Sequence, residues 1–148
     1  MKQKILISSF IVIAAISVML VWFLYFAPAT LQAEINSATI DTQQPVSLQQ
    51  GESTQFTISL RNIAGFRPIA KGVYGQLDLP EGFIENSLQT QTRELAFGLI
   101  LPGDAGHYGL NISAEDTVKP GSYYAKFTFW GENVQTQEID IAINVTSN

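Results

Sequence analysis

Apolar residues recur at every second position through most of the chain beyond residue 30. In the segment 54–62, Phe56, Ile58 and Leu60 alternate with polar residues, and the segment 139–145 repeats the pattern with isoleucine and valine. A period of two places alternate side chains on opposite faces of a β-strand, so one face is buried and the other is in water. The same alternation predicts strands at four further places: Val73–Leu79, Glu94–Ile100 (with Leu95, Phe97 and Leu99 inward), Tyr108–Ile112 and Tyr123–Phe129.

Turn-forming residues separate these strands. Glycine, proline and acidic residues cluster at 50–52, 80–82, 102–104, 119–121 and 131–133. An earlier, weaker strand is expected over Glu34–Ile40, and it resumes at Val46–Leu48. Short strands with turns at intervals of roughly ten residues are typical of a sandwich. We therefore expect residues 34–148 to form an all-β domain, an Ig-like antiparallel β-sandwich of about seven strands.

A long uncharged segment precedes this domain. Residues 5–27 contain no charged side chain, and a helix of that length is about 35 Å long, enough to cross a hydrocarbon core of about 30 Å. Lys2 and Lys4 precede it, and the positive-inside rule then places residues 1–4 in the cytoplasm. We expect a transmembrane signal anchor over 5–27 in the lipid bilayer, a tether over 28–33 and an extracytoplasmic domain, in the periplasm or at the cell surface.

A cleaved signal peptide is the alternative interpretation of this segment. Small residues at Ala27 and Ala29 resemble a cleavage site, but Pro28 lies between them and the apolar run exceeds the usual 7–15 residues. A pilin-type signal fits less well, because the apolar stretch lacks the acidic residue that such signals carry near their start.

Composition excludes several classes of function. Residues 28–148 hold six basic and thirteen acidic residues, a formal charge of −7, which argues against a nucleic-acid partner. The chain has no cysteine and a single histidine, His107, so thiol chemistry and multi-histidine metal sites are absent. No G-x-S-x-G motif occurs either. We expect a non-enzymatic protein with no cofactor, in which His107 has a structural or surface role.

Three turn motifs carry a resemblance to a known family. Residues 50–57 (QGESTQFT) are similar to a "PGES-x-x-F-T" strand, residues 79–83 (LPEGF) to an "LPEGW" turn, and residues 117–123 (TVKPGSY) to a "PGSY" turn. Together they resemble the NEW3/CARDB-type extracellular Ig-like domains, over roughly residues 50–130. Gln50 replaces the usual proline, and the family's "NTG" is replaced at 62–65. The resemblance implies an accessory module of surface and envelope proteins, without shared catalytic residues.

Two groups of residues are candidates for binding a partner. Tyr124 and Trp130 fall on the outward face of the 123–130 strand, where aromatic rings can stack on a sugar or anchor a protein. Phe66, Arg67 and Ile69 occupy a loop with the composition of an interface. Neighbouring strands covering the aromatics, or a Phe66 packed beneath the sandwich, are the structural alternatives.

Two N-x-[ST] triplets begin at Asn111 and Asn144, and both asparagines are expected to face outward as glycosylation acceptors. Acidic residues at 104, 115, 116 and 140 could gather to hold calcium, but no EF-hand spacing supports this.

The function expected from these features is that of a non-catalytic, membrane-anchored accessory or scaffold subunit. It would bind other membrane or envelope protein subunits through the Ig-like domain. A carbohydrate- or cell-wall-binding surface module, with a glycan as ligand, is the alternative.

Overall fold

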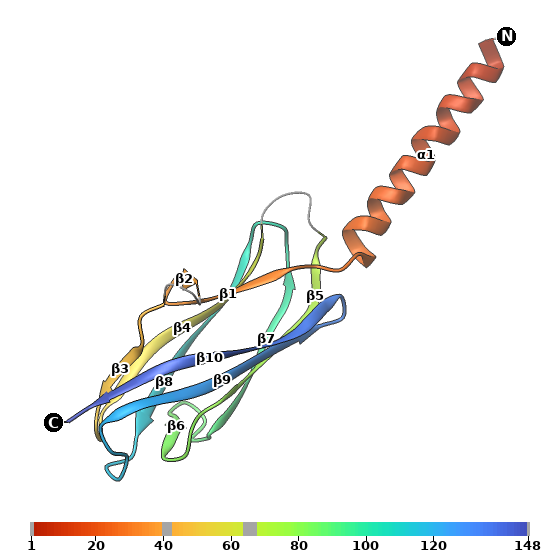
Figure 1. Ribbon diagram of the computed structural model, residues 1–148. Coiled ribbons are helices and arrows are strands. Elements are labelled where there is room, and N and C mark those ends of the chain that lie inside the picture. The colour runs from red at the N-terminus through yellow and green to blue at the C-terminus, as the bar shows by residue number, and fades with distance from the viewer. Residues whose placement is uncertain (1, 40–42, 64–67, 148) are drawn as a thin grey trace.

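The computed structural model describes residues 2–39, 43–63 and 68–147, and within the N-terminal helix it describes the side chains of residues 11–23. One helix is followed by ten strands in these ranges (Figure 1). They are α1 (Lys2–Phe26), β1 (Leu31–Ile35), β2 (Ala38–Thr39), β3 (Val46–Gln49), β4 (Ser53–Asn62), β5 (Ala70–Asp78), β6 (Phe83–Glu85), β7 (Thr92–Ile100), β8 (Ala105–Ala114), β9 (Gly121–Gly131) and β10 (Val134–Thr146).

The strands form two five-stranded sheets. Sheet I has the order β2-β1-β4-β8-β6, and sheet II has the order β3-β10-β9-β5-β7. Neighbouring strands pair antiparallel, except that β3 runs parallel to β10. The all-β prediction is confirmed, with more strands than expected. The region predicted as one strand over Glu34–Ile40 that resumes at Val46–Leu48 contains three strands, β1, β2 and β3, and β6 was not predicted.

One hydrophobic core lies between the two sheets. Side chains from both sheets form a single buried cluster, and Phe83, Phe127 and Phe129 are its largest fully buried members. The predicted inward faces are confirmed in β4, β8, β9 and β10, where Phe56, Leu110, Ala125 and Ile141 are buried among others. Burial of one face of each strand is what fixes the strand register.

The predicted face of β7 is wrong at Leu99. Leu95 is buried, but Leu99 is 57% exposed, and Ile100 takes the inward position. The pairing of β5 with β7 shifts its register on both sides of the Val73·Gly98 pair, and Gly98 has a φ of 72°. An irregularity of this kind inserts a residue and reverses the alternation beyond it.

The segment expected to be a tether is part of the fold. Leu31–Ala33 belong to β1, paired with Asn62–Leu60 of β4. Ala27 and Ala29 are buried although they precede the first strand. The side chain of Asn133 donates to the carbonyl of Ala27, and the backbone N–H of Ala29 donates to the carbonyl of Asn133. The chain therefore enters the sandwich directly after α1.

Helix α1 extends away from the sandwich (Figure 1). Its described side chains, residues 11–23, are all exposed, including Ile11, Met19, Val21 and Trp22. Over the part of the chain that the structure describes, no helix combines the length and apolarity needed to cross a membrane.

Candidate functional site

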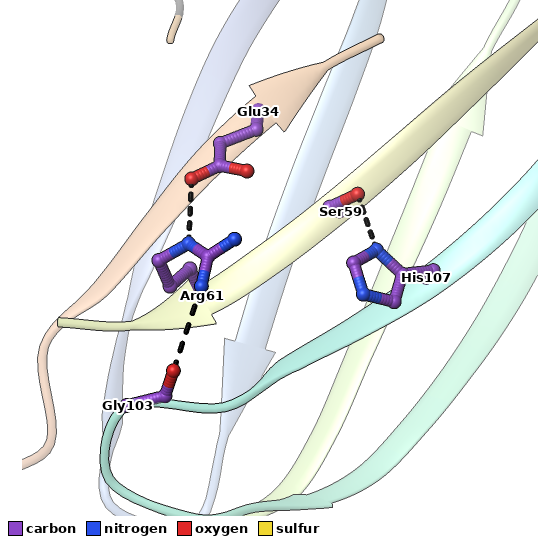
Figure 2. Close-up of polar contacts among 5 residues, drawn as sticks. All are labelled: Glu34, Ser59, Arg61, Gly103 and His107. Carbon is purple, nitrogen blue, oxygen red and sulfur yellow. Dashed lines mark hydrogen bonds and ion pairs between the residues drawn. The ribbon is translucent and has the colours of Figure 1, made fainter. Parts of the chain in front are cut away.

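A row of polar side chains crosses the outer face of sheet I (Figure 2). Glu34 on β1 pairs with Ser59 on β4, and Ser59 pairs with His107 on β8. Ser59 Oγ and His107 Nδ1 share a hydrogen bond of 2.7 Å. These strand positions alternate with the buried Ile58 and Leu60, so the row faces away from the core.

Arg61 contacts Glu34 at one end of this row. Its Nε donates to Glu34 Oε1 at 2.8 Å, and its Nη1 donates to the carbonyl of Gly103 at 3.5 Å (Figure 2). The hydrogen bond and the charge of Glu34 raise the pKa of the Arg61 guanidinium. Arg61 and His107 also line a surface cavity of about 450 Å³, together with residues 99–101 and 103–106.

The polar row does not have the geometry of a hydrolase. Ser59 is only 2% exposed, so a substrate carbonyl cannot approach its hydroxyl. The hydrogen bond from Arg61 engages Glu34, which lies on the far side of Ser59 from His107. A nucleophile needs a base that is itself oriented by a third group. The described contacts instead show a polar network that ties β1, β4 and β8 together.

The outer face of sheet II carries exposed aromatic rings. Tyr124 is 64% exposed and Trp130 is 36% exposed, which confirms that the even-numbered face of β9 points outward. Trp130 stacks on Tyr74 of β5, with ring centroids 6.4 Å apart and an interplanar angle of 25°. Tyr74 was missed by sequence reasoning. Its outward position follows from the alternation of β5, but its pairing with Trp130 depends on β5 lying beside β9.

Charged residues separate the aromatic pair from Tyr124. Lys126 Nζ lies 2.9 Å from Glu138 Oε1, and this hydrogen bond raises the pKa of the Lys126 ammonium. Asp78 accepts hydrogen bonds from the side chains of Gln76 and Thr92. The face of sheet II therefore has two separate aromatic spots with a polar band between them.

Of the three residues predicted to form a binding loop, the structure describes only Ile69. Phe66 and Arg67 lie outside the described residues. Ile69 is half-buried, and its carbonyl accepts a hydrogen bond of 2.8 Å from the side chain of Asn133.

The two candidate glycosylation asparagines are half-buried. Asn111 lies in β8, and its side-chain oxygen is buried without a hydrogen-bond partner. Asn144 lies in β10 between Ser47 of β3 and Ser122 of β9. Both alternate with buried neighbours, as the outward prediction requires.

The acidic residues considered for calcium are spread over the domain. Asp104 precedes β8 and Glu115 follows it, so the length of a ten-residue strand separates them. Among the described residues, no group of three or more histidine or acidic side chains is placed to hold a metal ion.

Comparisons with known proteins identify no family or function for this site. No protein-family model matches the chain, and no curated protein matches it. One solved structure with similarity to the chain is described as a family 123 glycoside hydrolase from Clostridium perfringens, studied for glycolipid glycan hydrolysis. It shares 12% sequence identity with a TM-score of 0.47, over 80% of this chain and 28% of the hydrolase chain. The chain thus spans about a quarter of that protein, and a resemblance this weak carries no argument.

Proposed function

We propose that the protein is a non-catalytic, membrane-anchored accessory or scaffold subunit of a membrane or envelope assembly. In this proposal α1 is a signal anchor with its N-terminus in the cytoplasm, and the sandwich is presented outside the cytoplasm. The support comes from the sequence, in which the uncharged stretch 5–27 follows Lys2 and Lys4, and from the exposure of the apolar side chains described in α1.

The strand order supports an Ig-like assignment within this proposal. In Ig folds one sheet has the order A-B-E-D, and the other contains C, F and G. The orders β1-β4-β8-β6 and β10-β9-β5 agree with this arrangement. Positive φ angles at Gly51 and Gly82 suit the turns that carry the NEW3/CARDB resemblance. One difference is that β6 comes before β7 in the chain, and β7 forms the edge of sheet II.

The junction between helix and sandwich is the observation that carries the proposal. Asn133 donates to the carbonyls of Ala27 and Ile69 and accepts from the backbone N–H of Lys71, at 2.8–2.9 Å. These contacts join the end of α1 to the start of β5 and to the β9–β10 turn. A sandwich fixed in this way beside an anchor suits a scaffold that presents one surface at a set height above the membrane.

The surface offered to a protein partner is the outer face of β9 around Tyr124. Tyr124 is the most exposed aromatic side chain in the described strands, and aromatic residues of this kind are common anchors of protein interfaces. Small residues on α1, Ala14, Ala15 and Ser17, are also exposed and allow close packing against another helix.

Isolation of the full chain in mild detergent, followed by mass spectrometry of the co-purifying chains, tests this function. We expect stoichiometric membrane proteins, a large loss of them with Tyr124→Ala, and no loss with the control Leu88→Ala. Replacing residues 5–27 with an unrelated anchor is expected to weaken the association partially. Recovery of the full chain from the soluble fraction, or without any stoichiometric partner, would contradict the proposal.

A carbohydrate-binding module is the second candidate, and the stacked pair of Tyr74 and Trp130 favours it. Exposed rings on a flat sheet can stack on pyranose rings. The full chain would then be retained on a polysaccharide column, and Tyr74→Ala would abolish retention. Passage of the unaltered chain through columns of several cell-wall polysaccharides would rule this candidate out.

A further inference from the structure

Exposed large apolar side chains outside α1 are unevenly distributed over the sandwich. The described strands and turns expose six of them: Tyr74, Leu88, Leu99, Leu101, Tyr124 and Trp130. Two, Leu99 and Leu101, flank the buried Ile100 at the end of β7. Trp130 is at the end of β9, and Tyr74 lies beside it. We call these four residues the proximal patch.

Hydrogen bonds connect the turns next to the proximal patch to the residues that follow α1. On one side, the β9–β10 turn that follows Trp130 is joined to Ala27 and Ala29 through Asn133. On the other side, the N–H of Ile63 donates to the carbonyl of Thr30, and Asn62 exchanges backbone hydrogen bonds of 2.9 Å with Gly103 and Asp104. The β9–β10 turn and the β7–β8 turn at residues 101–104 therefore both lie at the α1 end of the sandwich, as Figure 1 shows.

The proximal patch has two parts at the α1 end: Tyr74 and Trp130 lie on the outer face of sheet II, and Leu99 and Leu101 line the cavity that Arg61 and His107 also line. Trp130 on β9 pairs with Tyr74 on β5, and Tyr74 pairs with Ala96 on β7. The irregularity at Gly98 is what exposes Leu99, which is 57% exposed, and Leu101 is 46% exposed. A regular strand would have turned Leu99 into the core. The irregularity therefore leaves two leucines in contact with solvent at the α1 end of the sandwich.

We propose that the proximal patch lies on the lipid surface from which α1 emerges, so that the sandwich is docked against the bilayer. This inference rests on the proposed function, because α1 must be the anchor. Tryptophan and tyrosine favour the headgroup level, while leucine favours the acyl boundary. Leucines exposed at the same end of the domain as the aromatic pair suit lipid better than sugar, since a glycan offers hydroxyl groups. The charge of −7 on residues 28–148 favours neutral lipid over anionic lipid.

The chain has two tryptophans, Trp22 and Trp130, and each can report on one half of the proposal. The full chain carrying Trp22→Phe is reconstituted in phosphatidylcholine vesicles containing lipid with a quencher near the headgroup. We expect emission from Trp130 to lose intensity relative to vesicles without quencher. The double variant Leu99→Ser/Leu101→Ser in the same background is expected to restore that intensity. Leu88→Ser, the matched control on an exposed leucine remote from the patch, is expected to leave the quenching unchanged.

The reverse variant separates this inference from the proposed function. With Trp130→Phe, Trp22 is the only tryptophan, and a quencher at mid-acyl depth should reduce its emission if α1 is in the bilayer. Quenching of Trp22 without quenching of Trp130 would overturn the docking alone and leave the anchor standing. Lack of quenching at Trp22 would overturn both. Retained quenching of Trp130 in the folded double leucine variant would also overturn the docking, because the patch would not be what holds the sandwich on the lipid.

Discussion

At the scale of single residues, two asparagines hold the α1 end of the sandwich together. Asn133 satisfies two carbonyls and one N–H around the exit from α1. Asn62 is fully buried, and its side-chain N–H₂ donates to the carbonyls of Pro68 and Ile100. Each side chain bonds backbone groups at strand ends and in the adjoining loops, including the N–H of Lys71 in β5 and the carbonyl of Ile100 in β7.

Asn133→Ala is expected to lower the free energy of unfolding by roughly 2–4 kcal/mol, because it leaves several backbone groups without partners. Urea unfolding of the full chain carrying Trp22→Phe in detergent, followed by Trp130 fluorescence, measures the loss. Gln137→Ala, an exposed position on β10, is the control and should change the unfolding free energy little. Equal stability of both variants would contradict the proposed rigidity of the junction.

Glu85 makes stability depend on pH. It is 1% exposed, accepts from the N–H of Leu88 at 3.1 Å, and lies 3.8 Å from Arg93. Burial alone raises the pKa of the Glu85 carboxyl, but hydrogen bonds from Ser87 and Leu88 and the charge of Arg93 outweigh it, so the pKa is lowered overall. The folded state therefore favours the carboxylate.

This stabilisation is present above the ordinary glutamate pKa of about 4.3, and it is lost as pH falls through the lower folded value. Unfolding curves at a series of pH values should show stability falling in that acidic window. Glu85→Gln should be less stable than the unaltered chain near neutral pH and should lose less stability on acidification. An identical pH dependence for both proteins would show that Glu85 is not the responsible group.

At the scale of elements, Gly75 of β5 leaves room for the ring of Phe127 from the neighbouring strand β9. A Cβ built on Gly75 would lie 2.5 Å from the ring of the fully buried Phe127, whereas a Cβ on Gly109 in β8 would meet nothing within 4 Å. Neither has a left-handed φ. Substitutions at Gly75 and Gly109 therefore differ in how the added Cβ packs against the core, and not in backbone strain.

Gly75→Ala should destabilise the protein by about 1–3 kcal/mol, because it overpacks the core against Phe127. Gly109→Ala should be neutral or slightly stabilising, since glycine within a strand costs roughly 0.5–1 kcal/mol relative to alanine. Thermal unfolding of both variants compares them. A larger loss at Gly109 than at Gly75 would mean that the ring of Phe127 does not lie against Gly75 as the structure places it.

The regular strands could be predicted from the sequence, and their irregularities could not. The alternation of β4, β9 and β10 fixes their inward faces. A slip of one residue would expose Phe56 in β4, Phe127 in β9 or Ile141 in β10. The position of Leu99 depends on the register of β7 against β5, which involves residues far away in the chain. Tyr74 was likewise visible as an outward residue, but its stacking on Trp130 required the strand order of sheet II.

At the scale of the whole molecule, the domain begins earlier than the strand pattern indicates. Ala29, Leu31 and Ala33 are buried in the core cluster, although the alternation around them is weak. Three backbone pairs between β1 and β4 involve residues 31–33. A boundary placed at Glu34 would remove these contacts.

A fragment of residues 28–148 should accordingly be more stable than one of residues 34–148. Loss of the Leu31 side chain and its strand pairs is expected to cost roughly 2–4 kcal/mol, as truncation of a buried leucine typically does. Side-by-side urea unfolding monitored by circular dichroism measures the difference. Matching midpoints for the two fragments would show that residues 28–33 behave as a tether after all.

The parallel pairing of β3 with β10 has a mechanical consequence. Strand β10 runs to the end of the sandwich opposite α1, where the chain end marked C lies (Figure 1). Tension applied between α1 and that end would pull along the strands, so β10 would slide against β3 and β9, and β1 against β4. Because hydrogen bonds in a ladder run across the strands, a sliding load strains many of them at once. The domain is therefore built to resist stretching between α1 and the far end of β10.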